Sequence, residues 1–337
     1  MWRSRRLPLC KNNCVCLSLH IESNMKAFVA FFKLIRWPNL VFIALTQAVF
    51  FYGVVMPVLY QDLYVPTEVR SLFWILCISS VLIAAAGYII NDYFDLNIDL
   101  INKPDRLVVD RLVSRRWAIF FHMLFSMTGI LLGFYIGLQN GSWTIGIANS
   151  ICVFVLWFYS TTFKKKLLTG NILISLLTAW TVLVVYVYIL QREVNLSHQA
   201  YTSSQAKLFR LSILYAAFAF IATLIREVVK DMEDIQGDLK YGCKTMPIVW
   251  GIDFTKIFTG IWMVILLVLL FIVFYYILQL RMWIPALYEM VLIILPAGYT
   301  LKLLIKAETT LAFAKISFWI KIFILTGILS MLFFKFY

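Results

Sequence analysis

Charged residues are scarce in this sequence. Only 14% of its 337 residues are Asp, Glu, Lys or Arg, whereas 62% are hydrophobic. Soluble globular domains carry about 25% charged residues, so the composition excludes a soluble protein. A transmembrane helix needs about 20 apolar residues, which allows this chain at most about ten spans with short loops between them. The composition therefore predicts one polytopic, all-α domain in a lipid bilayer.

Cysteine is also sparse, and the cysteines do not form a disulfide framework in a chain of this size. They are Cys10, Cys14, Cys16, Cys77, Cys152 and Cys243. The cluster CKNNCVC has no His or second Cys pair at the spacing of a zinc site, which argues against bound zinc. The stretch before Met25 lacks the apolar centre of a signal peptide. We expect residues 1–24 to be disordered or an over-extended start, and residues 25–337 to form the membrane domain.

Acidic residues are outnumbered, and the formal net charge is +13. A nucleic-acid-binding protein would need a contiguous basic surface. Here Lys and Arg stand in short stretches between apolar runs, so no nucleic-acid partner is expected. Most of the 30 Lys and Arg residues fall on one side of the expected membrane, and cytoplasmic loops are the ones enriched in them. This predicts a multi-pass protein of the cell (inner) membrane with a cytoplasmic N-terminus.

Nine apolar runs, each bounded by charged or turn residues, predict nine transmembrane helices. They cover residues 39–60, 71–92, 117–138, 142–162, 171–190, 208–230, 255–279, 283–304 and 316–335. The segment KAFVAFFKLIRWPN before the first run mixes Phe with Lys and Arg, and predicts an interfacial helix anchored by Trp37.

Aspartates recur with the same spacing in two motifs, NDYFDLNID and KDMEDIQGD. In each motif they stand at i, i+3 and i+7, which share one face of an α-helix. Each motif therefore predicts a row of carboxylates, and both rows open on the cytoplasmic side. The first row offers Asn91, Asp92, Asp95 and Asp99; the second offers Asp231, Asp234 and Asp238, with Glu227 one turn earlier.

Two rows of carboxylates at one membrane depth repel each other unless a cation lies between them. Mg²⁺ prefers oxygen ligands, commonly one or two carboxylates with phosphate oxygens and water. The motifs therefore predict Mg²⁺ ions that bind a diphosphate and make it a leaving group. An isoprenyl chain on that diphosphate would suit the apolar helices. Solvated helix ends are the alternative interpretation, and the matched spacing of two motifs argues against it.

Basic side chains are needed as well, because a diphosphate carries more negative charge than one Mg²⁺ cancels. Arg binds phosphate with a bidentate fork and Lys as a point charge. The candidates beside the motifs are Lys103, Arg106, Lys164, Arg226 and Lys230. Membrane topology explains Lys165, Lys166, Arg115 and Arg116 better.

The motifs resemble those of the UbiA superfamily of intramembrane prenyltransferases. NDYFDLNID with INKPDR is similar to the family's first aspartate-rich motif and its loop, KDMEDIQGD to the second, and YSTTFKKKLLTGN to the segment between them. The resemblance runs from Met25 onward and implies nine helices around a central cavity capped by cytoplasmic loops.

The resemblance also implies roles for individual residues. The seven side chains of the two motifs would bind Mg²⁺ and diphosphate, and their aspartates, with Lys164, would be catalytic. Lys103, Arg106, Tyr159 and Lys164 would hold phosphate or cap the cavity. Arg36 and Asn39, in RWPN, match a polar pair at the start of the first span.

The implied reaction releases pyrophosphate and forms an allylic carbocation, which a lipid or aromatic acceptor attacks. The branch that looks most similar transfers geranylgeranyl to the glycerol hydroxyl of geranylgeranylglyceryl phosphate. The alternative is an aromatic acceptor such as 1,4-dihydroxy-2-naphthoate. After NKPDR the family commonly continues with Pro and a small-residue turn, whereas this chain reads LVVDRLVSRRWA. That difference leaves the choice of acceptor open.

A cation-coupled transporter is the rival class. It would need helices broken at mid-span by Gly or Pro in both halves. Pro57 and Pro296 do not form such a pair. The acidic motifs also lie at helix ends, which favours a site at the cytoplasmic face.

Overall fold

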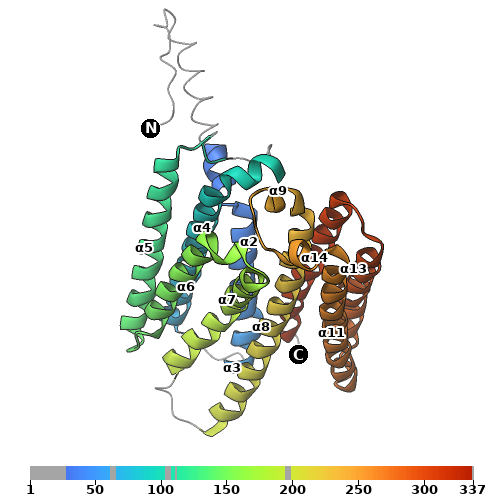
Figure 1. The fold of residues 1–337 in the computed structure, drawn as a ribbon. Coiled ribbons are helices and arrows are strands. Elements are labelled where there is room, and N and C mark those ends of the chain that lie inside the picture. The colour runs from blue at the N-terminus through green and yellow to red at the C-terminus, as the bar shows by residue number, and fades with distance from the viewer. Residues whose placement is uncertain (1–27, 61–65, 103–107, 111, 194–198, 336–337) are drawn as a thin grey trace, which may run out of the picture.

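The computed structural model describes residues 28–60, 66–102, 108–110, 112–193 and 199–335. Within these ranges the chain is helical, and nine helices are long and apolar enough to cross a membrane. All nine predicted spans are thereby confirmed. Figure 1 shows the helices packed in one bundle, with α4, α5 and α6 on one side and α11, α13 and α14 on the other. The chain is a multi-pass, all-α membrane protein.

The helices of the first half follow one another with short connections. They are α2 (Trp37–Phe50), which continues through the π-helical turn η1 (Phe51–Val55) into α3 (Met56–Leu59), then α4 (Thr67–Asn102), α5 (Arg115–Gln139), α6 (Thr144–Thr161), the 3-10 turn η3 (Phe163–Lys165) and α7 (Thr169–Glu193). Residues 28–34 form a short helix ahead of α2, where the interfacial helix is predicted.

The second half repeats the pattern of long spans with short helices between them. It consists of α8 (Gln199–Glu233), α9 (Ile235–Lys240), α10 (Met246–Val249), α11 (Ile252–Gln279), α12 (Trp283–Glu289) with the π-helical turn η4 (Met290–Ile294) and α13 (Leu295–Lys306), and α14 (Thr310–Ser330) with the 3-10 turn η5 (Met331–Lys335). The start of α2 and helix α9 lie toward the same end of the bundle (Figure 1).

Helix α4 runs well past its predicted span, which ends at residue 92, and reaches Asn102. The apolar run stops at Ile90, and hydropathy alone therefore places the end of the span too early. The helix continues because its polar residues bind side chains of other segments, as described below. Its last three turns carry the whole first acidic motif beyond the end of the apolar run.

Polar contacts and glycines hold α4, α5 and α6 close together. The Asn149 side chain donates to Ser79 Oγ at 2.8 Å and to the Gly129 carbonyl at 3.1 Å, and Ser79 donates to the same carbonyl at 2.8 Å. A Cβ on Gly133 would lie 2.4 Å from the Asn149 amide nitrogen. Small residues and interhelical hydrogen bonds are the usual means of packing helices in a membrane.

The eighth span stays continuous through its π-helical turn. The turn leaves the Leu292 carbonyl available, and Thr326 Oγ1 of α14 donates to it at 2.7 Å. Tyr288 in turn donates to the Thr326 carbonyl at 2.8 Å. These bonds satisfy backbone groups that lipid could not. The span is therefore joined to α14 at mid-helix and is not unwound there.

Candidate active site

The first acidic motif lies on the last turns of α4, and two of its carboxylates pair with cations from other segments. Arg36 donates to Asp92 Oδ1 at 2.5 Å, and the Lys164 ammonium contacts Asp95 Oδ1. Asn91 donates to Asp95 Oδ2 at 2.7 Å. The side chains of Asp92 and Asp95 are 14% and 15% exposed, so both ion pairs are largely shielded from solvent. Charge pairing makes this burial tolerable.

Arg36 reaches Asp92 from a sharp turn at the start of α2. Its φ of 50° is left-handed, a conformation that costs a non-glycine residue energy and often marks a functional site. The guanidinium carbon lies 5.5 Å from the centre of the Tyr88 ring, and Asn39 hydrogen-bonds to the Tyr88 hydroxyl. Burial by itself would lower the pKa of Arg36, but the Asp92 carboxylate outweighs it, and the pKa lies above its ordinary value.

Lys164 is presented by η3, the turn between α6 and α7. Gly170 makes this placement possible, because a Cβ there would lie 2.8 Å from the Lys164 Cα. Burial, and after it the charge of Lys165, lowers the pKa of the Lys164 ammonium to about 7. The contact with Asp95 opposes that shift, since a neighbouring carboxylate favours the charged form. The Lys244 amide donates to the Lys165 carbonyl at 2.8 Å and ties this turn to the loop after the second motif.

The second acidic motif is interrupted, which corrects the prediction of one row on one helix face. Helix α8 ends at Glu233, and Asp234 has φ −97° and ψ 8° as the N-cap of α9. Asn102, the last residue of α4, binds this break: its Nδ2 donates to the Asp234 carbonyl at 2.9 Å, and its Oδ1 accepts from the Gly237 amide at 2.8 Å. The Asp234 carbonyl still accepts from the Asp238 amide at 3.2 Å, and the Asn102 side chain adds bonds from another helix at this break. Asn102 joins the two motifs directly.

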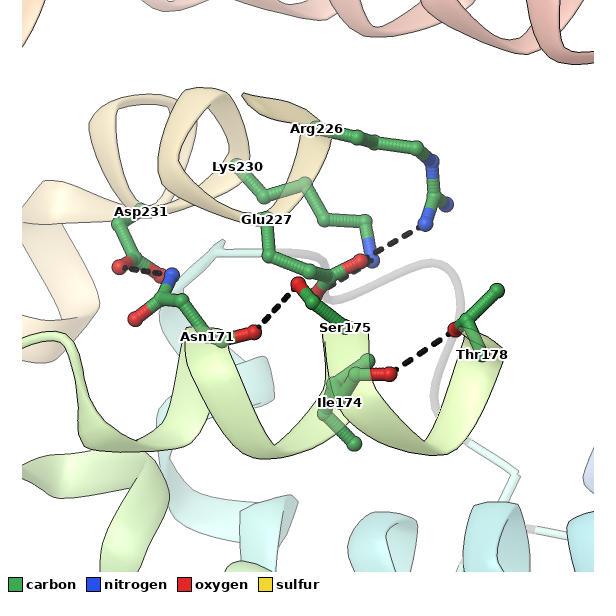
Figure 2. Close-up of polar contacts among 8 residues, drawn as sticks. All are labelled: Asn171, Ile174, Ser175, Thr178, Arg226, Glu227, Lys230 and Asp231. Carbon is green, nitrogen blue, oxygen red and sulfur yellow. Dashed lines mark hydrogen bonds and ion pairs between the residues drawn. The ribbon is translucent and has the colours of Figure 1, made fainter. Parts of the chain in front are cut away.

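The remaining charges of α8 form a group of their own (Figure 2). Glu227 accepts from Arg226 Nη1 at 2.7 Å and from Lys230 Nζ at 2.9 Å. Asp231, one turn further, accepts instead from Asn171 Nδ2 of α7 at 2.9 Å. Arg226 and Lys230 are thus ion-paired to Glu227, while an amide holds Asp231.

The predicted site residues converge from five segments of the chain. Tyr159 lies within electrostatic reach of Arg36, Glu227, Asp231 and Asp238. Asp99 is within reach of Arg36, and Asp238 of Lys164. Asp234 is joined to α4 through its backbone carbonyl. Lys103 and Arg106 lie outside the described residues.

Three residues that help to build the site are not among the predicted ones. Asn102 and Asn171 bind the second motif by their amides, and Tyr88 lies under Arg36. Asn102 has a weak signal in the sequence, since it belongs to the INKPDR segment. Asn171 has a similar signal, since it is the last residue of the YSTTFKKKLLTGN segment.

The donor set fits Mg²⁺. Among the described residues, no group of three or more His, Cys, Asp or Glu side chains converges as a ready metal site. However, the Asn91 Oδ1 atom is buried, and no described donor reaches it. A buried acceptor without a partner is costly and calls for a cation or a donor. Asn91 Oδ1 and the carboxylates of Asp92, Asp95 and Asp231 are oxygen atoms of the kind that Mg²⁺ prefers.

The fold and this site define an integral membrane protein with two acidic motifs and four partly buried cations at one end of a helical bundle. The profile of the UbiA prenyltransferase family matches residues 48–326. The chain belongs to the UbiA prenyltransferase family.

Known relatives and solved structures agree with that assignment. The chain is 36% identical over 180 residues to digeranylgeranylglyceryl phosphate synthase of Methanothermobacter thermautotrophicus, which covers 53% of this chain and 56% of the relative. It is 37% identical over 194 residues to the synthase of the same name from Methanothrix thermoacetophila, covering 57% of this chain and 61% of the relative. The chain thus spans little more than half the length of these relatives.

Two solved structures share the fold along nearly the whole chain. A digeranylgeranylglyceryl phosphate synthase structure superposes with a TM-score of 0.59 at 21% identity, covering 91% of this chain and 99% of that one. A UbiA homologue from Archaeoglobus fulgidus, bound to DMAPP and Mg²⁺, superposes with a TM-score of 0.55 at 15% identity, covering 89% and 98%.

Proposed function

We propose that this chain is a Mg²⁺-dependent prenyltransferase that transfers geranylgeranyl from its diphosphate to the glycerol hydroxyl of geranylgeranylglyceryl phosphate and releases pyrophosphate. The observation that carries the proposal is the bond between the ends of the two acidic helices: Asn102 ties the end of α4 to the break at Asp234, which supports a site shared by both motifs. The relatives named for this synthase support the choice of substrates.

The cations of the site are placed to act on a diphosphate. Arg36 and Lys164 are held against Asp92 and Asp95 by ion pairs, so both positive charges are in place before substrate enters. A preorganised cation stabilises the negative charge that grows on departing pyrophosphate, and it works best where water is excluded. Mg²⁺, when bound, would neutralise part of the diphosphate charge and make it a better leaving group. We also propose that Arg226 and Lys230 bind phosphate.

The apolar part of the substrate would lie among the helices, below these charges. The turn that carries Lys164 is tied to the loop after the second motif by the bond between Lys244 and Lys165. We propose that this link covers the site. Keeping water away from an allylic cation protects it from hydrolysis.

Pyrophosphate release by the detergent-purified protein tests the proposal. Geranylgeranyl diphosphate is supplied with either geranylgeranylglyceryl phosphate or 1,4-dihydroxy-2-naphthoate. We expect a prenylated product from the glyceryl phosphate only, with turnover lost on adding EDTA and restored by excess Mg²⁺. A product from the naphthoate alone would move the chain to the aromatic-acceptor branch. No turnover in folded protein with either acceptor would contradict the enzyme proposal and favour a transporter.

We propose further that the N-terminus and the site face the cytoplasm of the cell (inner) membrane, because Lys and Arg concentrate at the end of the bundle where the motifs lie. Nine spans then place Tyr337 on the opposite side. A phosphatase that is active only outside the cytoplasm is expected to be active when fused after Tyr337 and inactive when fused after Asp253. The reverse result would invert the orientation.

A further inference from the structure

The buried carboxylates of the site are held in two chemically different ways. Asp92, Asp95 and Glu227 each pair with at least one cation: Arg36, Lys164, or the pair Arg226 and Lys230. Asp231 is held by a neutral group instead. The side-chain amide of Asn171 donates to its carboxylate at 2.9 Å.

This difference affects how much charge each carboxylate can offer to a metal ion. A cation that pairs with a carboxylate offsets part of its charge and occupies one of its oxygens. A neutral amide fixes the position of the carboxylate without bringing a positive charge to it. Such a side chain orients a metal ligand without contacting the metal. Its loss typically weakens metal binding about 10- to 100-fold.

Asn171 is well placed to hold Asp231 still. It lies in the first turn of α7 and is only 8% exposed. Its backbone carbonyl accepts from Ser175 Oγ at 2.6 Å, one turn further along the helix (Figure 2). The adjacent Gly170 packs against Lys164, so the start of α7 is fixed by the turn that carries a predicted catalytic residue. The amide of Asn171 therefore approaches Asp231 from a rigid element.

We propose that Asn171 is a positioning residue, which binds Oδ2 of Asp231 so that the carboxylate presents its charge and its other oxygen to the Mg²⁺ of a metal–diphosphate complex. This inference rests on the proposed function. Asn171 touches neither substrate nor metal and acts through Asp231. Its loss leaves Asp231 free to rotate, which weakens binding of the metal more than binding of the prenyl chain.

Mn²⁺ binding, followed by electron paramagnetic resonance in the presence of unreactive geranylgeranyl thiolodiphosphate, tests this without turnover. We expect Asn171→Ala and Asn171→Leu to raise the Kd for Mn²⁺ about tenfold or more. Leu has the same number of side-chain heavy atoms as Asn, branched at the same position, and removes the donor, so it decides the question if the Ala variant does not fold. Thr178→Ala is the matched control, because among the described contacts its hydroxyl bonds only to the Ile174 carbonyl of its own helix. It should bind Mn²⁺ as the wild type does.

The outcomes separate this inference from the proposed function. If the wild type does not bind Mn²⁺ with the analogue, the Mg²⁺-dependent function itself fails. If the wild type binds Mn²⁺ and a folded Asn171 variant binds it equally well, only the positioning role is overturned. A higher Kd for Mn²⁺ supports the role if the midpoint of thermal unfolding of the metal-free protein is unchanged. A merely structural defect would lower that midpoint.

Discussion

Replacing Asp231 by Asn is expected to lower the rate of pyrophosphate release about 10³-fold. The change removes one negative charge from the carboxylate that we propose as a Mg²⁺ ligand. Metal ions contribute several kcal/mol of charge stabilisation in such sites, and about 4 kcal/mol corresponds to that factor. The fold should survive, because an Asn at this position can still accept the hydrogen bond from Asn171. Steady-state assays with geranylgeranyl diphosphate at saturating Mg²⁺ measure the effect.

The control for this variant is Asp253→Asn, which removes an acidic residue from the exposed first turn of α11. It lies near the same end of the bundle but outside both motifs, so its turnover should match that of the wild type. Asp231→Asn gives a cleaner test than a change at Asp95, because loss of Asp95 would leave the Lys164 cation buried without its partner. Turnover of Asp231→Asn within tenfold of the wild type would rule out Asp231 as an essential metal ligand.

Replacing Lys164 by Met is expected to lower pyrophosphate release at least about 10²-fold. Lys164 is 10% exposed and is held beside Asp95, where a positive charge can meet the departing pyrophosphate. Removing one preorganised stabilising group of this kind costs about 10²–10³ in turnover. Asp95 keeps the hydrogen bond from Asn91, which limits the loss of stability. Lys164→Arg, which retains the charge at greater length, should keep part of the activity.

Lys165→Met is the matched control for Lys164. This neighbouring side chain is exposed, and the contact that links the two loops uses its backbone carbonyl, which the substitution retains. We expect its turnover to stay within a factor of about two of the wild type, as for a surface substitution away from the site. Equal turnover of the Lys164→Met and Lys165→Met variants would show that Lys164 has only a topological role.

Much of the membrane architecture was predictable because the signals are local. An apolar run of about 20 residues specifies a span wherever it occurs, and the nine runs reappear as nine helices. The spacing of Asp92, Asp95 and Asp99 also specifies a helix face, and α4 carries all three. The same argument failed at Asp234, where the helix breaks. The spacing of the aspartates predicts a shared face only if the helix is regular, and it does not reveal the contact with Asn102.

The sequence by itself determined the class of protein, the number of spans and the residue types of the site, since these depend on composition and on short-range periodicity. The tertiary structure alone decided which groups pair. Asn171 meets Asp231 across 60 positions of sequence, and Asn102 meets Asp234 across 132. Such hydrogen bonds depend on how whole helices pack, and helix packing brings together residues with no common period in the sequence.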